Sequence, residues 1–364
     1  MVLLISTIII SSLYFLLVII FIIGWKRVFN FVPKGNENIT DNISIVVPCR
    51  NEQKHIRKLI STIAQQSYQN FELILVNDHS TDLTRNYIKT AQAAFSKIIL
   101  IDAVGFGKKN AIKEGILNST STFIVTTDAD CTPSYHWLET IACHQQKYPA
   151  DLLICPVKLS FDDTLFSYLQ MVEFATLVAT GASAVGVGMP ILCNAANMAF
   201  KKSAWLKSRE DLHEDEISGD DIFLLQSVKK RGGVIDFLKS ESAFVTSKPA
   251  ATLSEFIHQR RRWASKSPSY TDWQIIITAC VVLAISLLEI VLLYLSVYSL
   301  KALVLLSSVF VFKYILDNFF LFKIKKFFQL DHIWFYSLLL SVIYPFYIVF
   351  VGLSALVIKP KKWK

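Results

Sequence analysis

Long apolar runs flank a block of mixed polarity in this sequence, and the pattern predicts membrane helices at both ends. Residues 2–25 are apolar except for Ser, Thr, Tyr and Gly side chains. At about 1.5 Å per residue, a helix of this length crosses a hydrocarbon core roughly 30 Å thick. The runs 275–298 and 302–322 have the same apolar character. We therefore predict a chain that is inserted into a bilayer.

The first apolar run is predicted to be an uncleaved anchor. A secretory signal starts with basic residues and has an apolar core of about 7–15 residues, whereas residues 2–25 lack the basic start and are longer. Lys26, Arg27 and Lys34 come after this run, and the positive-inside rule places this basic end and the middle block in the cytoplasm. We expect an integral protein of a bacterial inner membrane with a cytoplasmic middle block.

The last apolar run, 333–358, leaves two alternatives open. Lysines at 323, 325 and 326 precede it and mark a return to the cytoplasm, and Pro345 interrupts it. If the run spans the bilayer, the lysines at 359, 361, 362 and 364 lie outside, against the positive-inside rule. The run is therefore either one more span or a kinked or re-entrant segment.

The middle block alternates strand-type and helix-type patterns. Predicted strands cover 43–48, 71–76, 97–101, 122–127 and 152–159, and predicted helices cover 55–65 and 109–117. This alternation indicates βαβ units, a mainly parallel sheet and an α/β fold. The apolar stretch 165–192 contains Gln170 and Glu173, and we predict a buried or interfacial helix and loop there.

Polar residues come directly after three of the predicted strands, at the edge where such sheets bind ligands. They are Pro48 to Glu52 after the first strand, Asn77 to Asp82 after the second, and Asp128-Ala129-Asp130 after the fourth. Any one of these segments has an ordinary explanation as turn chemistry. Three acidic strand ends side by side in one sheet instead predict a convergent carboxylate site.

The third of these segments and a nearby lysine suit the binding of a diphosphate. Asp128 and Asp130 offer the oxygen ligands that Mg²⁺ or Mn²⁺ takes together with substrate phosphates, so we predict one of these ions as cofactor. Lys108 stands near the start of a predicted helix, where an anion such as pyrophosphate binds. A solvated lysine is the alternative explanation for Lys108.

Two further motifs lie closer to the C-terminal runs. Asp220 and Asp221 begin an apolar-periodic helix, and a carboxylate pair exceeds what helix capping needs, so one can act as a general base. The segment Gln259-Arg260-Arg261-Arg262-Trp263 precedes the membrane run. It is either a basic patch with an interfacial tryptophan at the membrane surface, or a set that contacts a phosphate and a sugar face.

Composition supports a membrane protein and excludes several function classes. Hydrophobic residues make up 53% of the 364 residues and charged residues 18%, against about 25% charged residues in ordinary soluble domains. The net charge is +8, but basic and acidic side chains balance within 28–274. The excess lies beside the apolar runs, so we exclude nucleic acid as a partner. The predicted domains are an anchor at 1–26, a cytoplasmic domain at 27–273 and a C-terminal membrane region of two or three spans or a re-entrant segment at 274–364.

Taken in order, these motifs resemble the signatures of the membrane-anchored family 2 glycosyltransferases. That family has the GT-A fold and includes cellulose, chitin and hyaluronan synthases and ceramide glucosyltransferases. The matching motifs are P-x-x-N-E-type at Pro48 to Glu52, acidic at Asp78 and Asp82, G-K-x-x-A at Gly107, Lys108 and Ala111, D-x-D at Asp128 and Asp130, the acidic pair Asp220-Asp221, and Q-x-x-R-W at Gln259, Arg262 and Trp263. The stretch Asn194 to Phe200 is similar to a further family motif, with Ala where Gly is common.

The resemblance implies a role for each of these positions. Pro48, Glu52 and Asp78 would hold the nucleotide base and ribose. Lys108 and Asp128 would lie along the nucleotide and the diphosphate, and Asp130 would be the metal ligand. Asp221 would be the general base, although the family's usual Glu-Asp pair leaves Asp220 as the alternative. Gln259, Arg262 and Trp263 would contact the diphosphate and the acceptor.

The resemblance also implies the reaction, an inverting transfer of sugar from a nucleotide-diphosphate sugar. We expect a UDP-sugar rather than a GDP-sugar as donor, and a single transfer to a lipid-linked or membrane-proximal glycan acceptor. A processive polysaccharide synthase is the first alternative. It needs a channel of several helices, so chains would have to associate as a homo-oligomer. A nucleotidyltransferase and a non-catalytic membrane scaffold are the rivals from other classes.

Overall fold

A computed structural model describes residues 1–33, 41–213, 216, 219–331 and 333–357. The described chain forms two compact units. The sheet unit comprises Val28–Ser160 and Leu192–Lys248. The helical unit comprises Met1–Arg27, Phe161–Ile191 and the chain from Pro249 to its last described residue. The predicted domain boundaries at 26 and 273 differ from this division, because the unit formed by the apolar helices also takes in the two segments Phe161–Ile191 and Pro249–Asp272.

Within the described residues, the sheet unit is built on a seven-stranded sheet with the order β3-β2-β1-β4-β8-β6-β9. Its strands are β1 (Ile43–Cys49), β2 (Phe71–Asn77), β3 (Ile98–Asp102), β4 (Phe123–Thr126), β6 (Leu152–Ile154), β8 (Met198–Lys201) and β9 (Ile235–Phe237). Strands β3, β2, β1 and β4 are parallel, and β8 runs antiparallel to both of its neighbours. The mainly parallel α/β sheet predicted from the sequence is confirmed.

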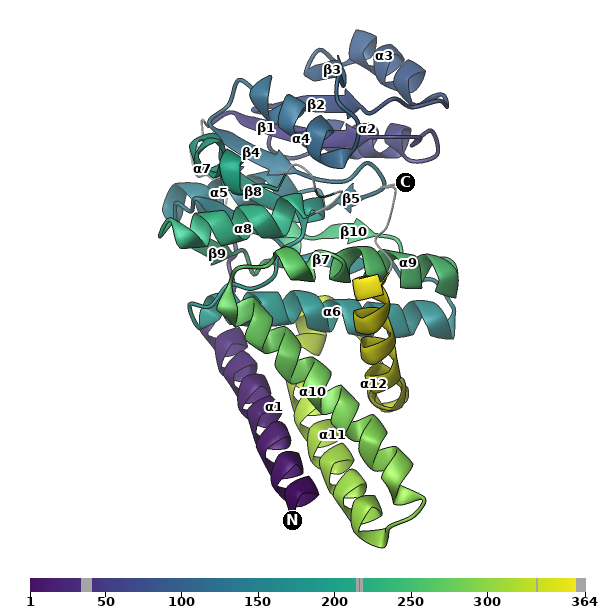
Figure 1. The fold of residues 1–364 in the computed structure, drawn as a ribbon. Coiled ribbons are helices and arrows are strands. Elements are labelled where there is room, and N and C mark those ends of the chain that lie inside the picture. Colours follow the sequence, from purple (N-terminus) through teal and green to yellow (C-terminus); the bar gives the residue numbers. More distant parts are fainter. Residues whose placement is uncertain (34–40, 214–215, 217–218, 332, 358–364) are drawn as a thin grey trace. The chain divides into compact units, whose positions relative to one another are not determined.

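Amphipathic helices accompany these strands (Figure 1). They are α2 (Ile56–Ala64), α3 (Thr84–Ala94), α4 (Lys108–Leu117), α5 (Trp137–Lys147), α7 (Lys202–Ser208) and α8 (Asp220–Lys230). In α2, the residues Ile56, Leu59, Ile60 and Ile63 are buried, which is the three-to-four spacing of one helix face. Short 3₁₀ turns occur at Ala195–Asn197, Arg209–Asp211 and Glu241–Ala243.

The predicted strand 152–159 is wrong as one element. It divides into β6 and β7 (Val157–Leu159), and β7 belongs to a second sheet with β5 (Thr132–Pro133) and β10 (Val245–Ser247). Pro156 separates the two strands, and proline has no N–H to continue a sheet ladder. Its carbonyl instead accepts hydrogen bonds from Asn197 Nδ2 at 2.7 Å and from the Val245 N–H at 3.2 Å.

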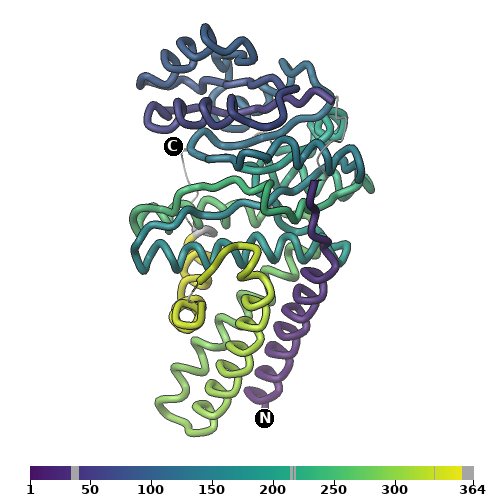
Figure 2. Tube along the Cα trace, turned by 180° about the vertical axis from the view of Figure 1, so that it is seen from behind, coloured from purple at the N-terminus to yellow at the C-terminus, as the bar shows by residue number. Residues whose placement is uncertain are grey.

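Long helices form the helical unit. They are α1 (Val2–Arg27), α6 (Leu165–Gly186), α9 (Leu253–Ala264), α10 (Trp273–Ser296), α11 (Leu300–Phe328) and α12 (Ile333–Val357), with a 3₁₀ turn at Ser267–Ser269. Among the described residues, five of them are long and apolar enough to cross a membrane, all except α9. Helices α1, α10 and α11 pack against one another, and α6 runs across the end of this group (Figures 1 and 2).

The sequence-predicted apolar helices are therefore present, and α12 contains Pro345 within one continuous helix. Helix α6 buries much of its length, including Gln170 and Glu173, as predicted for a buried helix. It packs closely on α1, because a Cβ at Gly24 would lie 1.9 Å from the Ser183 carbonyl oxygen. Lys34 and the four tail lysines at 359, 361, 362 and 364 lie outside the described residues.

Substitution of Gly115 tests the packing of α4 on the sheet. A Cβ built there lies 2.5 Å from Val46 Cγ1 and 3.1 Å from Val76 Cγ2, both in the buried strands β1 and β2. We expect Gly115→Ala to lower the free energy of unfolding by about 1–3 kcal/mol through overpacking, measured by denaturant unfolding of the detergent-solubilised protein. Ser61→Ala, at an exposed site in α2, is the control. Equal stability of the two variants would contradict this packing.

Candidate active site

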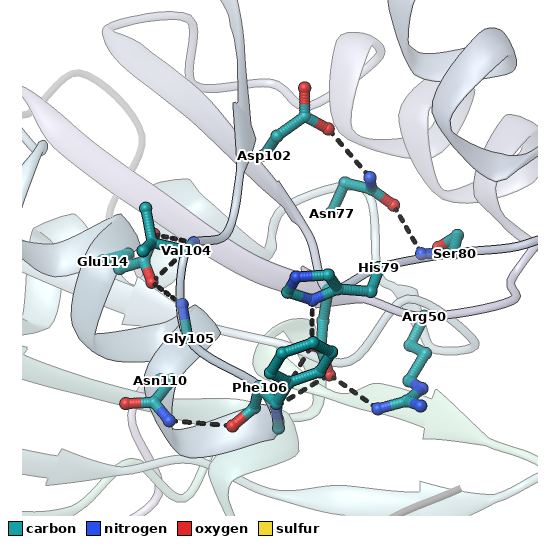
Figure 3. A network of polar contacts seen from close by, with 12 residues as sticks. Arg50, Asn77, His79, Ser80, Asp102, Val104, Gly105, Phe106, Asn110 and Glu114 are labelled. Atoms are coloured by element: carbon teal, nitrogen blue, oxygen red, sulfur yellow. Dashed lines mark hydrogen bonds and ion pairs between the residues drawn. The ribbon is translucent and has the colours of Figure 1, made fainter.

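The carboxylate of Asp78, directly after β2, is the most enclosed acidic group at the strand ends, with a side chain that is 0% exposed. The N–H of Gly107 donates to both of its oxygens at 3.1 Å, and Arg50 Nη1 lies 3.3 Å from Oδ2. His79 Nδ1 lies 3.1 Å from Oδ1. Asp78 also donates its own N–H to the Cys49 carbonyl at 2.8 Å. The network in Figure 3 thus joins the ends of β1 and β2 to the start of α4.

Local backbone geometry places these groups. Gly107 has φ +94° and His79 has φ +52°, in the region that only glycine adopts without strain. Glu114 of α4 accepts the N–H groups of Val104 and Gly105, which ties the loop before Gly107 back onto the helix. The His79 and Phe106 rings stack with centroids 3.8 Å apart (Figure 3). The result is a flat aromatic pair beside a buried carboxylate.

Glu52 and Pro48 occupy the neighbouring strand end. Pro48 lies in β1 beyond the pairing with β4, which ends at Val46 and Thr126. Glu52 is buried, donates its N–H to Thr84 Oγ1 at 2.7 Å, and its carboxylate contacts His55 Nδ1 at 2.9 Å. Burial lowers the pKa of the His55 imidazole, and the nearby charge of Lys248 lowers it further.

The Asp128-Ala129-Asp130 segment comes after β4 and carries the next carboxylates. Lys108 Nζ donates to Asp128 Oδ1 at 2.5 Å, so the lysine at the start of α4 neutralises one of the two charges. Burial raises the pKa of the Asp130 carboxyl above its ordinary value, and the charge of Asp128 raises it further. The two carboxylates are therefore close enough to affect each other's ionisation at the carboxyl end of β4.

This carboxylate pair fits a divalent cation that completes its coordination with substrate oxygens. In the part of the chain that the structure describes, no group of three or more His, Cys, Asp or Glu side chains is close enough to hold a metal by itself. Mg²⁺ is commonly held by one or two carboxylates together with substrate phosphates and water. The oxygen-only donor set of Asp128 and Asp130 matches that pattern.

The two adjacent aspartates at the start of α8 have different surroundings. Asp221 accepts the N–H of Ile222 at 2.7 Å and that of Ala195 at 3.4 Å. The carbonyl of Ala195 accepts from Thr126 Oγ1 at 2.8 Å, so Asp221 lies at the same end of β4 as Asp128. Asp220 instead lines a cavity with Lys109, Trp205 and Phe200.

Residues 44–205 match the model of glycosyl transferase family 2. This match covers β1 to β4, β8 and the carboxylates described above, apart from the pair at the start of α8. The chain carries a glycosyl transferase family 2 domain.

Curated relatives of this domain are glycosyltransferases by name. Glycosyltransferase GlyA of Streptococcus pneumoniae serotype 4 is 28% identical over 116 residues, 32% of this chain and 17% of that protein. Poly-beta-1,6-N-acetyl-D-glucosamine synthase of Staphylococcus aureus is 24% identical over 153 residues, 41% of this chain and 36% of that protein. The chain therefore aligns with only 17% to 36% of the length of these two relatives.

A solved structure shows the same fold over most of the chain. The mannosyltransferase PcManGT from Pyrobaculum calidifontis, in complex with GDP-Man and Mn²⁺, has a TM-score of 0.59 at 15% sequence identity. The alignment covers 93% of this chain and 99% of that one. The GT-A fold predicted for the family 2 domain is confirmed.

The Q-x-x-R-W segment lies on α9 in the helical unit. Gln259 Oε1 accepts from Arg260 Nη1 at 2.9 Å. Trp263 packs at a tilt against Phe174 of α6, and Arg262 is half-buried. These residues belong to a different unit from the strand-end carboxylates.

The sequence pattern did not predict the role of Arg260, the residue that holds this segment in place. Arg260 is 5% exposed, forms an ion pair with the buried Glu173 of α6, and lies over the rings of Phe256 at 4.6 Å and Trp263 at 4.3 Å. A signal was present, because Glu173 stands in an otherwise apolar stretch and a buried carboxylate needs a cationic partner. The stacked pair of His79 and Phe106 was also missed.

Breaking the Arg260–Glu173 pair should destabilise the helical unit. Glu173→Gln leaves the guanidinium of Arg260 buried without its counter-ion, which costs about 3–5 kcal/mol for a buried pair. We expect a clearly lower midpoint of thermal unfolding in detergent. Glu210→Gln, which removes an exposed carboxylate, should leave the midpoint unchanged. Equal midpoints of thermal unfolding for the two variants would show that the pair is not a determinant of stability.

Proposed function

We propose that this protein transfers a sugar from a nucleotide-diphosphate sugar to a membrane-associated acceptor, with inversion at the anomeric carbon. The observation that carries the proposal is the convergence of Asp78, Asp128 and Asp221 at one end of the strands β2, β1 and β4, in a chain whose residues 44–205 match family 2. In this proposal the donor binds along that edge, from its base at β2 to its diphosphate at β4.

The base and ribose are assigned to the first two strand ends. Asp78 is held rigidly by Gly107 and Arg50, so its position is set before the nucleotide arrives and little reorganisation is needed on binding. Pro48 and Glu52 border the same end of the sheet. The donor is proposed to be a UDP-sugar, with a GDP-sugar as the alternative that the mannosyltransferase of similar fold raises.

The diphosphate is assigned to Lys108, Asp128 and Asp130. Mg²⁺ or Mn²⁺, when held by the two aspartates, would supply positive charge next to the leaving diphosphate. The ammonium of Lys108, 2.5 Å from Asp128, stabilises negative charge at the same place. Lys108 also starts α4, whose N-terminus favours a phosphate oxygen.

Asp221 is proposed as the general base. It would take the proton from the acceptor hydroxyl as that oxygen forms a bond to the anomeric carbon and the nucleotide diphosphate departs from the opposite face. Its carboxylate contacts the Ala195 N–H at 3.4 Å, and the Ala195 carbonyl accepts from Thr126 Oγ1 at the end of β4, which supports the assignment. Asp220, which lines a cavity with Lys109 and Phe200, is the alternative.

The acceptor is proposed to be lipid-linked or membrane-proximal. Five described helices are long and apolar enough to span a bilayer, and we propose that they hold the sheet unit at the cytoplasmic face of a bacterial inner membrane. In this proposal Gln259, Arg262 and Trp263 contact the diphosphate and the acceptor. The relative that is a poly-N-acetylglucosamine synthase raises processive synthesis as the alternative, and the length of the product made by purified protein separates the two.

The general-base assignment is tested by matched substitutions. We expect Asp221→Asn to lower the rate of sugar transfer by about 100-fold or more, the range that loss of a general base produces, while nucleotide binding measured by calorimetry is retained. Asp220→Asn, the neighbouring control, should reduce transfer less. The reverse ranking would move the base to Asp220, and near-normal turnover in both variants would remove the role from α8.

The metal assignment is tested by chelation and by nucleotide titration. We expect EDTA to stop transfer and Mn²⁺ or Mg²⁺ to restore it, and Asp130→Asn to weaken metal-dependent binding of UDP or GDP in calorimetry. Serial titration of both nucleotides also identifies the base of the donor. A protein that binds neither nucleotide would favour the non-catalytic scaffold, and full activity in chelator would remove the metal role from Asp130. Release of pyrophosphate instead of nucleoside diphosphate would identify a nucleotidyltransferase.

A further inference from the structure

A cluster of ionisable side chains lies within the helical unit, on the helices α1, α10 and α11. It consists of Tyr14 of α1, Glu289 of α10, and Lys313 and Asp317 of α11, and we call it the helix-core cluster. Glu289 is 5% exposed and Lys313 is 4% exposed. The three helices pack against one another (Figure 1). Ionisable groups in such a position are costly and are commonly functional.

Three members of the helix-core cluster form an ion pair and a hydrogen bond with one another. Lys313 Nζ lies 3.1 Å from Asp317 Oδ2, one helical turn along α11, and Tyr14 donates its hydroxyl to Asp317 Oδ1 at 2.8 Å. Lys313 Nζ also lies 5.6 Å from the centre of the Tyr14 ring and 6.0 Å from that of Tyr344 in α12. The ammonium and the Asp317 carboxylate therefore form a neutral, hydrogen-bonded pair.

Glu289 is different. Both of its carboxylate oxygens are buried, and neither has a hydrogen-bond partner among the described residues. Lys313, Asp317 and Tyr14 are the groups that interact with it electrostatically, and the one cation among them already has Asp317 as its counter-ion. An ionised Glu289 would be an uncompensated buried charge, which costs far more than the same group in its neutral form.

We propose that Glu289 is a proton-binding site and carries a neutral carboxylic acid at neutral pH. The charge balance supports this, because two carboxylates face one ammonium and one bound proton makes the cluster neutral. A metal cation fits less well, since it needs several oxygen ligands, and no group of three or more His, Cys, Asp or Glu side chains in the described chain is close enough to hold one. The proposal does not rest on the proposed transferase function.

Proton binding at this site links pH to the packing of α1, α10 and α11. Loss of the proton at alkaline pH places one extra negative charge between these helices, next to Asp317. The charge is then relieved only by movement of Lys313 away from Asp317 or by entry of water. The protonated and deprotonated proteins therefore differ in the arrangement around Lys313, and the site is a proton-sensitive element inside the helical unit.

Infrared spectroscopy of the purified full chain in lipid vesicles tests the proposal, because it detects a protonated carboxylic acid directly. Exposed carboxylates have an ordinary pKa of about 4 and are ionised at neutral pH, so they give no carboxylic-acid carbonyl band. We expect such a band in the wild-type protein at neutral pH, shifted by deuterium exchange and lost on alkalinisation. Glu289→Gln should abolish it, and Glu241→Gln, at an exposed position, should retain it.

Asp317→Asn is a second variant that keeps Glu289 in place. It removes the counter-ion of Lys313, so Glu289 should become the ionised partner of the lysine and the acid band should disappear. A purely structural role of Glu289 would not produce this loss. The proposal is overturned if wild-type and Glu289→Gln spectra are alike, or if the band persists in Asp317→Asn. It is also overturned if the band appears only when sodium is replaced by choline, which would identify a sodium site.

Discussion

The burial of one carboxylate, that of Asp78, organises the end of the sheet on which the candidate site depends. A buried charge is tolerated only when donors surround it, and the donors here come from three separate segments: Arg50 after β1, His79 beside Asp78 itself, and the N–H of Gly107 before α4. Meeting that requirement brings the ends of β1 and β2 and the start of α4 together. Because Lys108 is the next residue after Gly107, the same arrangement directs the lysine toward Asp128.

Buried charged groups in the helical unit also have partners that compensate their charge. Arg260 and Glu173 join α9 to α6 through a buried ion pair, and Lys313 and Asp317 neutralise each other within α11. Breaking a buried pair costs more than making it gains, so the Arg260–Glu173 contact serves mainly to hold α9 in one place on α6. Glu289 lacks such a partner among the described residues, and for that reason a proton is the simplest means of neutralising it.

Sequence patterns predicted the parallel strands because β1, β2 and β3 are mainly apolar runs between turn residues. Their observed limits differ from the predicted ones by a residue at most. The segment 152–159 looks equally continuous, but its pairing depends on Pro156 and on partners from the distant segments around Asn197 and Val245. The role of Arg260 and the His79–Phe106 stack were missed for a related reason. Their partners are set by tertiary contacts or backbone angles that carry no periodic signal.

The residues of the family motifs are divided between the two units, and this division bears on how transfer would work. The strand-end carboxylates are held by the sheet unit, whereas Gln259, Arg262 and Trp263 are fixed to α6 through Arg260 and Glu173. Movement of α6 would therefore carry the whole Q-x-x-R-W segment with it as one body. If acceptor contacts reside on that segment, the acceptor is positioned by the apolar helices and the donor by the sheet. The proposed lipid-linked or membrane-proximal acceptor fits this division of contacts between the two units.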